Sequence, residues 1–278
     1  MTRLLVFGLS GQIGAALVPL LEAGDFRVLA VSRKPRPDSA VIQWQLASLE
    51  TAPAWPAEFD AILSLGPLDA FAQWLGSCQP PAKRVIAIGS TSAQSKAGVS
   101  DPSERSLAAN LLQAEAGLRG TCEKAGIGLT LLRPTLIYGN GRDHSLTPML
   151  AMARRWRVLP WPFTATGLRQ PVHADDLARA VLQCLDRPET AGHCFDLPGG
   201  EELTVAAMLK RSARVLAPDA YLLPVPTWAF GLALKAAARA SGQPVSVRGI
   251  IQRLKRDQLF DAEPARLAFG FSPRRFSP

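Results

Sequence analysis

Three glycines at a fixed spacing form the part of the sequence whose chemistry is most readily named. Gly8, Gly11 and Gly14 follow an aliphatic run at residues 4–7 and open a segment of helical pattern at residues 12–23. Such a turn uses its first glycine for a tight bend, its second for close approach of the backbone to a pyrophosphate, and its third for close packing of helix on strand. The N–H groups that open the helix attract the phosphate charge. The residues expected to bind a dinucleotide here are Gly8, Ser10, Gly11, Gln12, Ile13 and Gly14, and a glycine turn without a ligand is the alternative.

The end of the second expected strand indicates which dinucleotide fits. An Asp or Glu at this point would bind the adenosine ribose hydroxyls, but the sequence reads Val31-Ser32-Arg33-Lys34. A serine beside two cations suits a 2′-phosphate, because guanidinium binds phosphate in a forked, charge-assisted geometry. The sequence therefore predicts NADP, bound by Ser32, Arg33 and Lys34. NAD is the alternative, with Arg33 pointing into solvent.

Short aliphatic runs alternate with helical segments along the first half of the chain, which implies βαβ units and a parallel sheet. Two of the runs, at residues 4–7 and 85–88, are continuously apolar, as expected of strands covered by helices on both faces. The fold class is therefore expected to be α/β, with a doubly wound, Rossmann-type sheet. Strands are expected at residues 4–7, 27–31, 60–65, 84–88 and 129–132, and helices at 12–23, 70–76 and 103–125.

The composition changes beyond residue 142, where Pro, Trp and Arg become frequent and strand signals weaken. Helices are expected at residues 175–185, 204–216 and 228–240 from apolar spacing and flanking Gly and Pro. We expect a dinucleotide-binding domain at residues 1–165, to which residues 170–195 return. Residues 196–278 are expected to form a smaller, mixed substrate lobe.

Charge and cysteine usage limit the kinds of partner. The formal charge is +8, but no basic run has the length of a nucleic-acid-binding tail, so solvated faces are favoured and no nucleic-acid partner is expected. The apolar stretch at residues 222–234 contains two prolines and is too short to span a membrane. No signal peptide is evident, and no metal-ligand spacing occurs. Reduced thiols and a cytoplasmic location are therefore expected for Cys78, Cys122, Cys184 and Cys194.

Four segments in this order and spacing resemble the extended short-chain dehydrogenase/reductase family, in its NAD-dependent epimerase/dehydratase group, which acts largely on nucleotide sugars. They are the turn at residues 8–14, Val85-Ile86-Ala87-Ile88-Gly89-Ser90-Thr91-Ser92, Leu132-Arg133-Pro134-Thr135-Leu136-Ile137-Tyr138-Gly139, and Arg169-Gln170-Pro171-Val172-His173-Ala174-Asp175-Asp176-Leu177-Ala178.

The resemblance implies a catalytic hydroxyl at the end of the fifth strand, at Ser90, with Thr91 beside it. A polar strand end that only caps a loop is nearly as good an interpretation. The family's general acid/base is a Tyr followed four residues later by a Lys on the next helix. Aligning Glu115 with the family's acidic residue puts Leu107 and Leu111 at those two positions, so the chain looks like an atypical member without the catalytic pair. The cofactor is also expected to contact Leu65, Gly66, Gly89 and Pro134.

Other groups could stand in for the missing pair. Tyr138 is a catalytic candidate, although the family signature favours a structural role for it, and Lys96 is expected in solvent. Arg169 precedes the His-x-x-Asp segment where nucleotide-sugar enzymes bind the substrate diphosphate, and a surface salt bridge is its alternative. His173 is a substrate-site candidate for which a role near the start of the next helix is favoured. Arg142 completes the expected substrate-binding set of Arg142, Arg169 and His173, and His144 is expected to be a loop or lobe contact.

Two classes of function follow from these residues. The first is a reductase- or epimerase-like enzyme that uses NADP or NAD on a nucleotide sugar or other anionic small molecule. The second is a catalytically silent protein that binds NADP as a sensor or as a structural or interaction partner. A homodimer is an implication of the family resemblance.

Overall fold

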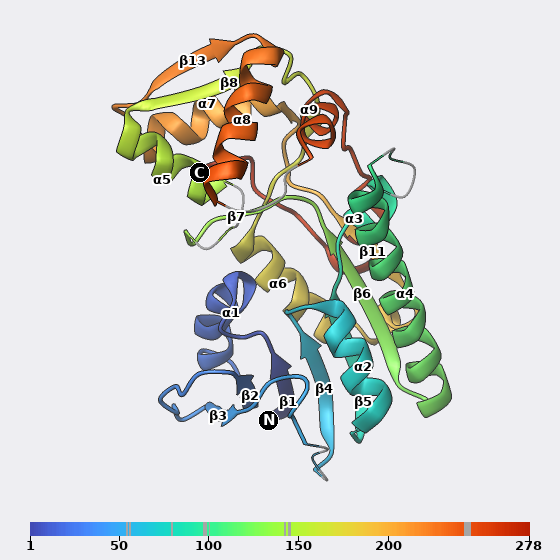
Figure 1. The fold of residues 1–278 in the computed structure, drawn as a ribbon. Coiled ribbons are helices and arrows are strands. Elements are labelled where there is room, and N and C mark those ends of the chain that lie inside the picture. The colour runs from blue at the N-terminus through green and yellow to red at the C-terminus, as the bar shows by residue number, and fades with distance from the viewer. Residues whose placement is uncertain are drawn as a thin grey trace.

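A seven-stranded parallel sheet forms the base of the molecule, in the order β11-β6-β5-β4-β1-β2-β3 (Figure 1). The computed structural model describes residues 1–53, 55, 57–78, 80–96, 99, 101–141, 143, 146–241 and 246–278. The strand order reverses between β1 and β4, which makes this the topological switch point of a doubly wound sheet. The strands are β1 (Thr2–Phe7), β2 (Phe26–Ser32), β3 (Ile42–Leu46), β4 (Phe59–Ser64), β5 (Ala82–Ile88), β6 (Gly128–Pro134) and β11 (Cys194–Leu197).

Helices cover both faces of this sheet, and strand residues alternate between the two cores. Leu4 and Val6 pack with one face, while Leu5 and Phe7 pack with the other. The doubly wound α/β fold expected from the continuously apolar strands is thereby confirmed. One face carries α1 (Gln12–Glu22), α6 (Ala174–Leu185) and α10 (Glu263–Phe269), and the other carries α2 (Leu68–Cys78) and α4 (Pro102–Ala125).

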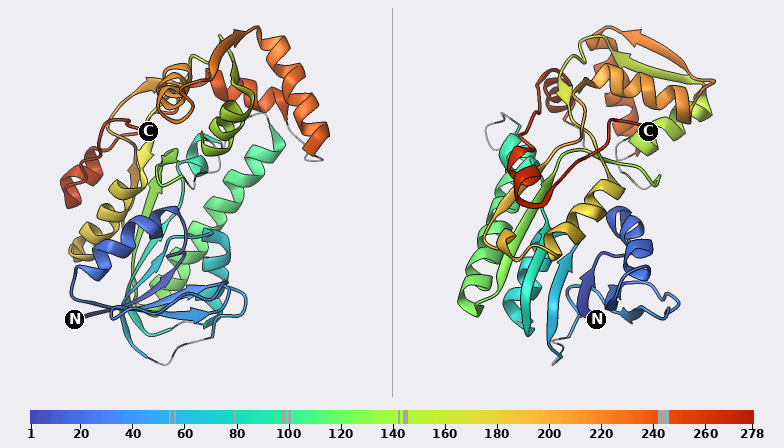
Figure 2. Two further views of the ribbon diagram at one scale, coloured as in Figure 1. Left: turned by 90° about the vertical axis from the view of Figure 1, so that its left-hand side faces the viewer. Right: turned by 180° about the vertical axis from the view of Figure 1, so that it is seen from behind.

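A lobe with its own hydrophobic core stands over the carboxyl ends of the strands (Figures 1 and 2). Short strand pairs join it to the sheet, namely β7 (Ile137–Tyr138) with β10 (Val172–His173) and β9 (Leu168–Arg169) with β12 (Leu203–Thr204). Its main elements are α5 (Leu146–Trp156), β8 (Val158–Pro162), α7 (Val205–Leu216), β13 (Tyr221–Val225), α8 (Thr227–Ser241) and α9 (Val247–Lys255).

The chain crosses between sheet and lobe several times. Helix α5 and strand β8, which the sequence groups with the dinucleotide-binding part, pack against α7 and β13 in the lobe. Helix α10, which the sequence groups with the lobe, packs on the sheet beside α6 and β11. Periodicity shows which face of a segment is apolar but not which partner covers it. The assignment of α5, β8 and α10 to sheet or lobe could therefore not be predicted from the sequence.

The elements expected in the first half of the chain are present, and two further elements were not expected. The eight strands and helices expected in residues 4–132 are all present, within a few residues of their expected bounds, whereas β3 and the short helix α3 (Ser92–Ser95) were not expected. The stretch at residues 222–234 divides between β13 and α8, and no helix among the described residues could cross a membrane.

All four cysteines are free. Cys122 and Cys184 are buried, and burial raises the pKa of their thiols to about 11 and about 12. Both thiols therefore stay protonated at neutral pH. Within the described ranges, no cluster of His, Cys, Asp and Glu could hold a metal ion.

Candidate functional site

The segments expected to contact a cofactor meet at one edge of the sheet. Gly8 follows β1, Gly66 lies two residues beyond β4, and Gly89 follows β5, while Ser32 and Pro134 end β2 and β6. Parallel strands bring all their carboxyl ends to the same edge, and open α/β sheets bind ligands there at the switch point. The Leu65 N–H donates to the Phe7 carbonyl oxygen at 2.9 Å, which holds the loop after β4 against the end of β1.

The glycine turn has the shape of a phosphate cradle. Gly8 has φ +82°, and a Cβ there would lie 2.8 Å from the Gly66 nitrogen. A Cβ on Gly14 would lie 2.3 Å from the Leu9 carbonyl oxygen, so the first turn of α1 can pack on the backbone of the glycine turn only without a side chain. A Cβ on Gly11 would meet a single atom of the described residues within 4 Å, the Gly8 oxygen at 3.1 Å. Gly8 and Gly14 are thus closed in by protein, whereas Gly11 faces open space at the start of α1.

The start of α1 is free to receive an anion. Gly11 is the N-cap residue, and no side chain caps the helix there, while the first N–H groups of a helix have no partner within it. The Gln12 amide Nε2 donates to the Gly139 carbonyl oxygen at 2.9 Å and ties the turn to the loop after β7. Gly139 has φ +97°, and a Cβ there would lie 2.3 Å from His173 Nε2.

The end of β2 presents two cations to solvent. Ser32 Oγ donates to the Lys34 carbonyl oxygen at 2.8 Å and accepts from the Lys34 N–H at 3.2 Å, so its hydroxyl shapes the turn. Arg33 and Lys34 are exposed. Arg33 lies close enough to Glu50 to contribute to the lowered pKa of that carboxyl, after the larger effects of the Ser48 side chain and of the Glu50 backbone.

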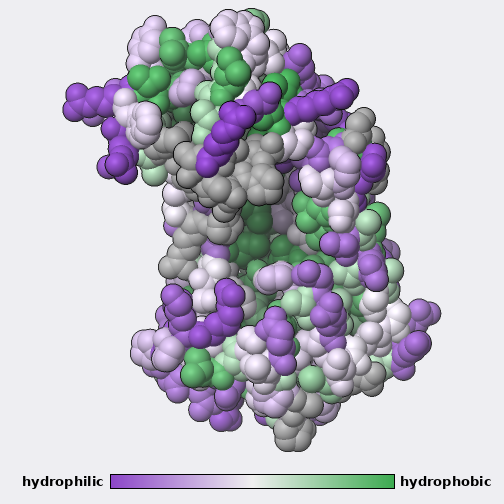
Figure 3. Space-filling view, viewed as in Figure 1, coloured by the Kyte–Doolittle hydropathy of each residue, from purple (hydrophilic) through white to green (hydrophobic). Residues whose placement is uncertain are grey.

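A cavity of about 660 Å³ lies between this edge and the lobe. The molecule is hollowed at this level, with apolar residues on the floor of the hollow (Figure 3). Gln12 reaches the cavity from the glycine turn, and the cavity therefore joins the expected cofactor site to the lobe. Its other lining residues are Ser90, Thr91, Ser92, Lys96, Thr135, Leu136, Ile137, Asp143, Met149, Pro160, Trp161, Pro162, Arg169, Val205, Met208, Leu209, Phe230, Leu234, Ile250, Arg253, Leu254 and Gln258.

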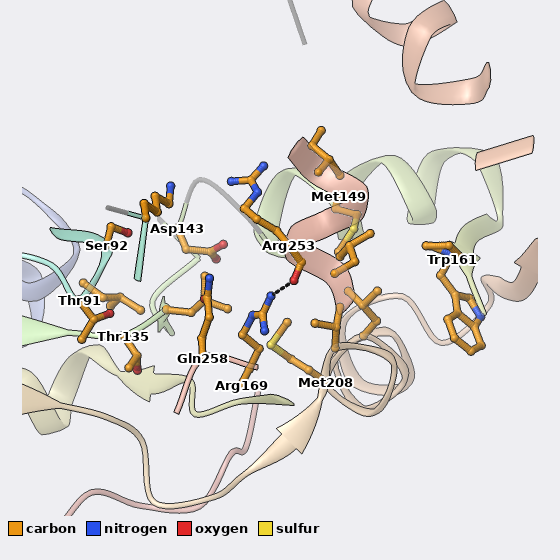
Figure 4. A pocket seen from close by; sticks show the side chains of 18 of the residues that line it. Thr91, Ser92, Thr135, Asp143, Met149, Trp161, Arg169, Met208, Arg253 and Gln258 are labelled. Carbon is orange, nitrogen blue, oxygen red and sulfur yellow. Dashed lines mark hydrogen bonds between the residues drawn. The ribbon is translucent and has the colours of Figure 1, made fainter. Parts of the chain in front are cut away.

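Hydroxyl groups line the end of the cavity at the sheet (Figure 4). The Thr91 N–H and hydroxyl both donate to the Pro134 carbonyl oxygen, at 3.1 and 3.2 Å, and Thr91 is buried. Ser90 Oγ accepts from the Ser92 N–H at 3.1 Å and can still donate its own proton. Thr91 therefore fixes the strand end, while Ser90 is the better placed of the two to bind a ligand oxygen.

Lys96 also lines this cavity, and the expectation that it lies in loop solvent was wrong. The helix α3, which ends just before Lys96, folds the residues after β5 back toward the sheet edge, a local turn that the sequence did not indicate. Burial is the main cause of the lowered pKa of the Lys96 ammonium, with Glu104 acting against it and Arg253 adding to it. Lys96 is thus a partly desolvated cation that lines the same cavity as Ser90.

Arg169 lies at the middle of the cavity and is 8% exposed. Its guanidinium donates to the Arg253 carbonyl oxygen at 2.5 Å, the bond drawn in Figure 4. It also donates to the Arg256 carbonyl oxygen at 2.7 Å, just after α9. Burial, followed by the charge of Arg253, lowers the pKa of Arg169 to about 10, against a smaller opposing effect of the Asp257 carboxylate. In the described part of the chain, no carboxylate forms an ion pair with Arg169, whereas Arg253 pairs with Glu104 at 2.9 Å. The surface salt bridge considered for Arg169 is therefore not found, and its charge faces the cavity.

Tyr138 is not brought to the cavity. It is 2% exposed. Its hydroxyl accepts from the Ser277 N–H at 3.1 Å and donates to the Arg275 carbonyl oxygen at 3.4 Å. Burial raises the pKa of the phenol. The catalytic candidacy of Tyr138 has no support in this placement, and the structural role that the sequence favoured describes it.

His173 packs edge-on against the Tyr138 ring and is the N-cap residue of α6. Its Nδ1 accepts from the Asp175 N–H at 3.1 Å, so the neutral ring carries its proton on Nε2. Burial lowers the pKa of His173 in spite of the opposing charge of Asp175. His173 is outside the set of cavity-lining residues, and Arg142 and His144 lie outside the described residues.

The helix expected to hold the family's Tyr and Lys is α4. Glu115, which anchors the alignment, is 4% exposed at its side chain and forms a two-point ion pair with Arg133 of β6. Gly89 packs against this pair, since a Cβ on Gly89 would lie 3.2 Å from Glu115 Oε1. Leu107 is 43% exposed, and Leu111 is half-buried. Neither side chain can transfer a proton.

Comparison with known proteins finds similarity to epimerases and dehydratases that depend on NAD. Residues 72–197 match the model of the NAD dependent epimerase/dehydratase family. A UDP-glucuronic acid 4-epimerase from Bacillus cereus, solved in complex with NAD, superposes with a TM-score of 0.72 at 12% identity, over 98% of this chain and 93% of that chain. The chain therefore has the doubly wound fold of the epimerase structures. The predicted resemblance to the extended short-chain dehydrogenase/reductase family, in its epimerase/dehydratase group, is confirmed.

Two curated relatives match shorter segments. A UDP-glucose 4-epimerase from Vibrio cholerae is 25% identical over 120 residues, which is 43% of this chain and 37% of the relative. The NADH dehydrogenase [ubiquinone] 1 alpha subcomplex subunit 9, mitochondrial, from Dictyostelium discoideum is 29% identical over 75 residues, which is 27% of this chain and 20% of the relative. The matched segments thus span 37% of the length of the first relative and 20% of the length of the second.

Proposed function

We propose that the protein binds a nicotinamide dinucleotide at the glycine turn and acts on an anionic small molecule, such as a nucleotide sugar, in the cavity. The observation that carries the proposal is the cradle at the switch point, closed by protein at Gly8 and Gly14 and open at Gly11. A ligand held there would extend along the strand ends to Ser90. The names of the relatives, which include two UDP-sugar epimerases, support the same class of substrate.

Three side chains of the cavity have roles in this proposal. A bound nicotinamide dinucleotide would supply hydride chemistry. Ser90 would donate a hydrogen bond to the reacting oxygen of the substrate. Arg169 would offset the negative charge of the anionic substrate. Lys96 would move the proton, because a desolvated ammonium with a lowered pKa gives up its proton more readily than one in water.

We further propose NADP as the cofactor, although the solved relative binds NAD. Arg33 and Lys34 are exposed at the end of β2, where a 2′-phosphate would lie, and no Asp or Glu occurs within residues 31–37. Arg33→Ala should weaken NADPH binding by roughly tenfold and leave NADH binding unchanged, since one charge-assisted phosphate contact is removed. Isothermal titration of both nucleotides checks this, and equal affinities in both proteins would remove the argument for NADP.

Cofactor binding itself is tested by calorimetry on the ligand-stripped protein. Gly11→Val should abolish nucleotide binding while the fold persists, because the added side chain enters the open side of the cradle. Gly117→Val is the matched control, since a Cβ on Gly117 of α4 meets no atom of the described residues within 4 Å. A wild-type protein that takes up neither NADPH nor NADH would end the proposal.

A silent, cofactor-binding protein is the second candidate. Leu107 and Leu111 stand where the family's proton-transfer pair is expected, and a 75-residue segment matches a subunit of an NADH dehydrogenase. Incubating the loaded protein with a panel of sugar nucleotides and following the cofactor's absorbance separates the candidates. Turnover that is lost in Ser90→Ala and Lys96→Met supports the enzyme, and tight binding without turnover on any substrate supports the sensor. Homodimer formation and a cytoplasmic location remain proposals.

A further inference from the structure

The wall of the cavity on the lobe side is apolar. It is built from helices α5, α7, α8 and α9 and from strand β8, which contribute thioether, aliphatic and aromatic side chains. In Figure 4 the two methionines and Trp161 lie away from the hydroxyl groups of the sheet edge, with the arginines between them. The side chains that define this wall are Met149, Met208, Leu209, Phe230, Leu234 and Leu254.

This wall is poorly suited to a nucleobase. A base such as uracil presents alternating donors and acceptors, and each loses its bond to water on burial unless the protein replaces it. Pro160 and Pro162 of β8 have no N–H to offer. Away from their ends, the wall helices bond their backbone groups internally. Trp161 adds one buried indole N–H without an acceptor among the described residues. One donor does not match the edge of a base.

Positive charge is concentrated between the apolar wall and the hydroxyl groups. Lys96, Arg169 and Arg253 line the cavity, and the lining residues include one carboxylate, Asp143. Arg253 is paired with Glu104, but the buried guanidinium of Arg169 is bonded only to carbonyl oxygens within the described residues. A buried cation without a carboxylate partner is unfavourable, and a ligand that brings the opposite charge offsets this cost.

We propose that the substrate of this site is a phosphate ester whose far end is an apolar chain or ring system in place of a nucleoside. The phosphate lies beside Lys96 and Arg169, the apolar part packs on the lobe wall, and the group at the other side of the phosphate faces Ser90. A volume of about 660 Å³ accommodates a ligand of this size. The inference rests on the proposed function, of which it names the substrate class.

The test is a set of calorimetric titrations of the cofactor-loaded protein. The probes are decyl phosphate, hexyl phosphate, inorganic phosphate and UDP, with the alkyl phosphates kept below their micelle concentrations. Decyl phosphate should bind at least tenfold more tightly than UDP. It should also exceed hexyl phosphate by more than tenfold, since each buried methylene is worth about fourfold in affinity.

Two leucines on α8 provide a matched pair of variants. Leu234→Gln should lower the affinity for decyl phosphate about tenfold, because Leu234 lines the wall. Leu232→Gln should leave it unchanged, since Leu232 is 58% exposed on the same helix and is not among the cavity-lining residues. Melting temperatures of both variants check that each still folds.

Three results would overturn the inference. They are UDP binding more tightly than decyl phosphate, no dependence on chain length, and equal losses in the two α8 variants, which would mean surface adsorption. Nucleotide titration is a separate measurement and keeps the two proposals apart. If NADPH binds and decyl phosphate does not, this inference alone is wrong, whereas failure of NADPH and NADH to bind refutes the proposed function.

Discussion

The phenol of Tyr138 is bonded to residues near the end of the chain. Its ring packs edge-on against His173 and Phe276, with centroids 4.9 and 4.7 Å away, and its hydroxyl bonds to the backbone of residues 275 and 277. A single residue type, tyrosine at the end of a strand, is compatible with proton transfer or with packing. Its partners decide between these roles, and here they are structural.

Tyr138→Phe should therefore cost about 1–2 kcal/mol of the free energy of unfolding, because the Ser277 N–H loses its acceptor. Any turnover of the enzyme should be unchanged. Urea unfolding and steady-state kinetics measure the two effects. A variant of full stability that has lost turnover would restore Tyr138 as a catalytic residue.

His173 makes the stability of the protein depend on pH at the acidic side of neutrality. Its pKa is lowered from 6.5 in the folded protein, chiefly by burial, so the unfolded chain takes up the proton first. Stability should be fully present above pH 6.5 and should fall as the pH drops below that value.

His173→Asn should flatten this dependence, because asparagine keeps a capping oxygen for the Asp175 N–H and does not titrate. Melting temperatures at pH 7.5 and pH 5 provide the comparison. An equal fall in both proteins would assign the acid sensitivity to other groups.

Helix α4 and strand β6 are held together by the ion pair of Glu115 and Arg133. The side chains are 4% and 12% exposed, so both charges are largely out of water. The hydrogen bond to Glu115 raises the pKa of Arg133. The ion pair explains why the acidic Glu115 lies on the buried face of α4, a helix that contains no tyrosine.

Arg133→Met should lower the free energy of unfolding by about 3–5 kcal/mol, since it leaves the Glu115 carboxylate buried and unpaired. The double variant Glu115→Leu with Arg133→Met should recover much of this loss, because no charge is then left without a partner. Denaturant unfolding of the three proteins forms the test. A loss below 1 kcal/mol in the single variant would mean that water reaches the carboxylate.

For the molecule as a whole, the last residues connect the sheet and the lobe. Phe271 packs in a core of the sheet, whereas Phe276 packs in the core of the lobe. Between them, the Arg274 guanidinium pairs with Asp176 at 3.0 Å and Asp175 at 3.3 Å at the start of α6. The orientation of the lobe over the cavity therefore depends on this segment as well as on the short strand pairs.

Truncation after Phe271 should loosen the lobe before the sheet unfolds. Calorimetric scans should then show a broadened or divided transition at lower temperature, because the lobe core loses Phe276 and Asp176 loses Arg274. Arg275→Ala is the control, since that side chain is exposed. A single transition at the original temperature would show that the strand pairs alone hold the lobe.

The sequence was sufficient for the features that depend on neighbouring residues. The turn with Gly8, Gly11 and Gly14, the strands buried on both faces, and the arrival of Gly66, Gly89 and Ser90 at one edge all follow from local pattern and from parallel pairing. The glycine requirement at Gly8 is local as well, since it arises from a positive φ and a close backbone.

Tertiary structure decided which side chains the cavity receives. Lys96 lines the cavity. Tyr138 bonds instead to the backbone of Arg275 and Ser277, which follow it by 137 and 139 residues. Arg169 bonds to carbonyl groups that follow it by 84 and 87 residues. The same holds for α5 and β8, whose apolar faces are covered by α7 and β13. A side chain's charge state and its partners depend on which distant segments exclude water from it, and no pattern of neighbouring residues contains that information.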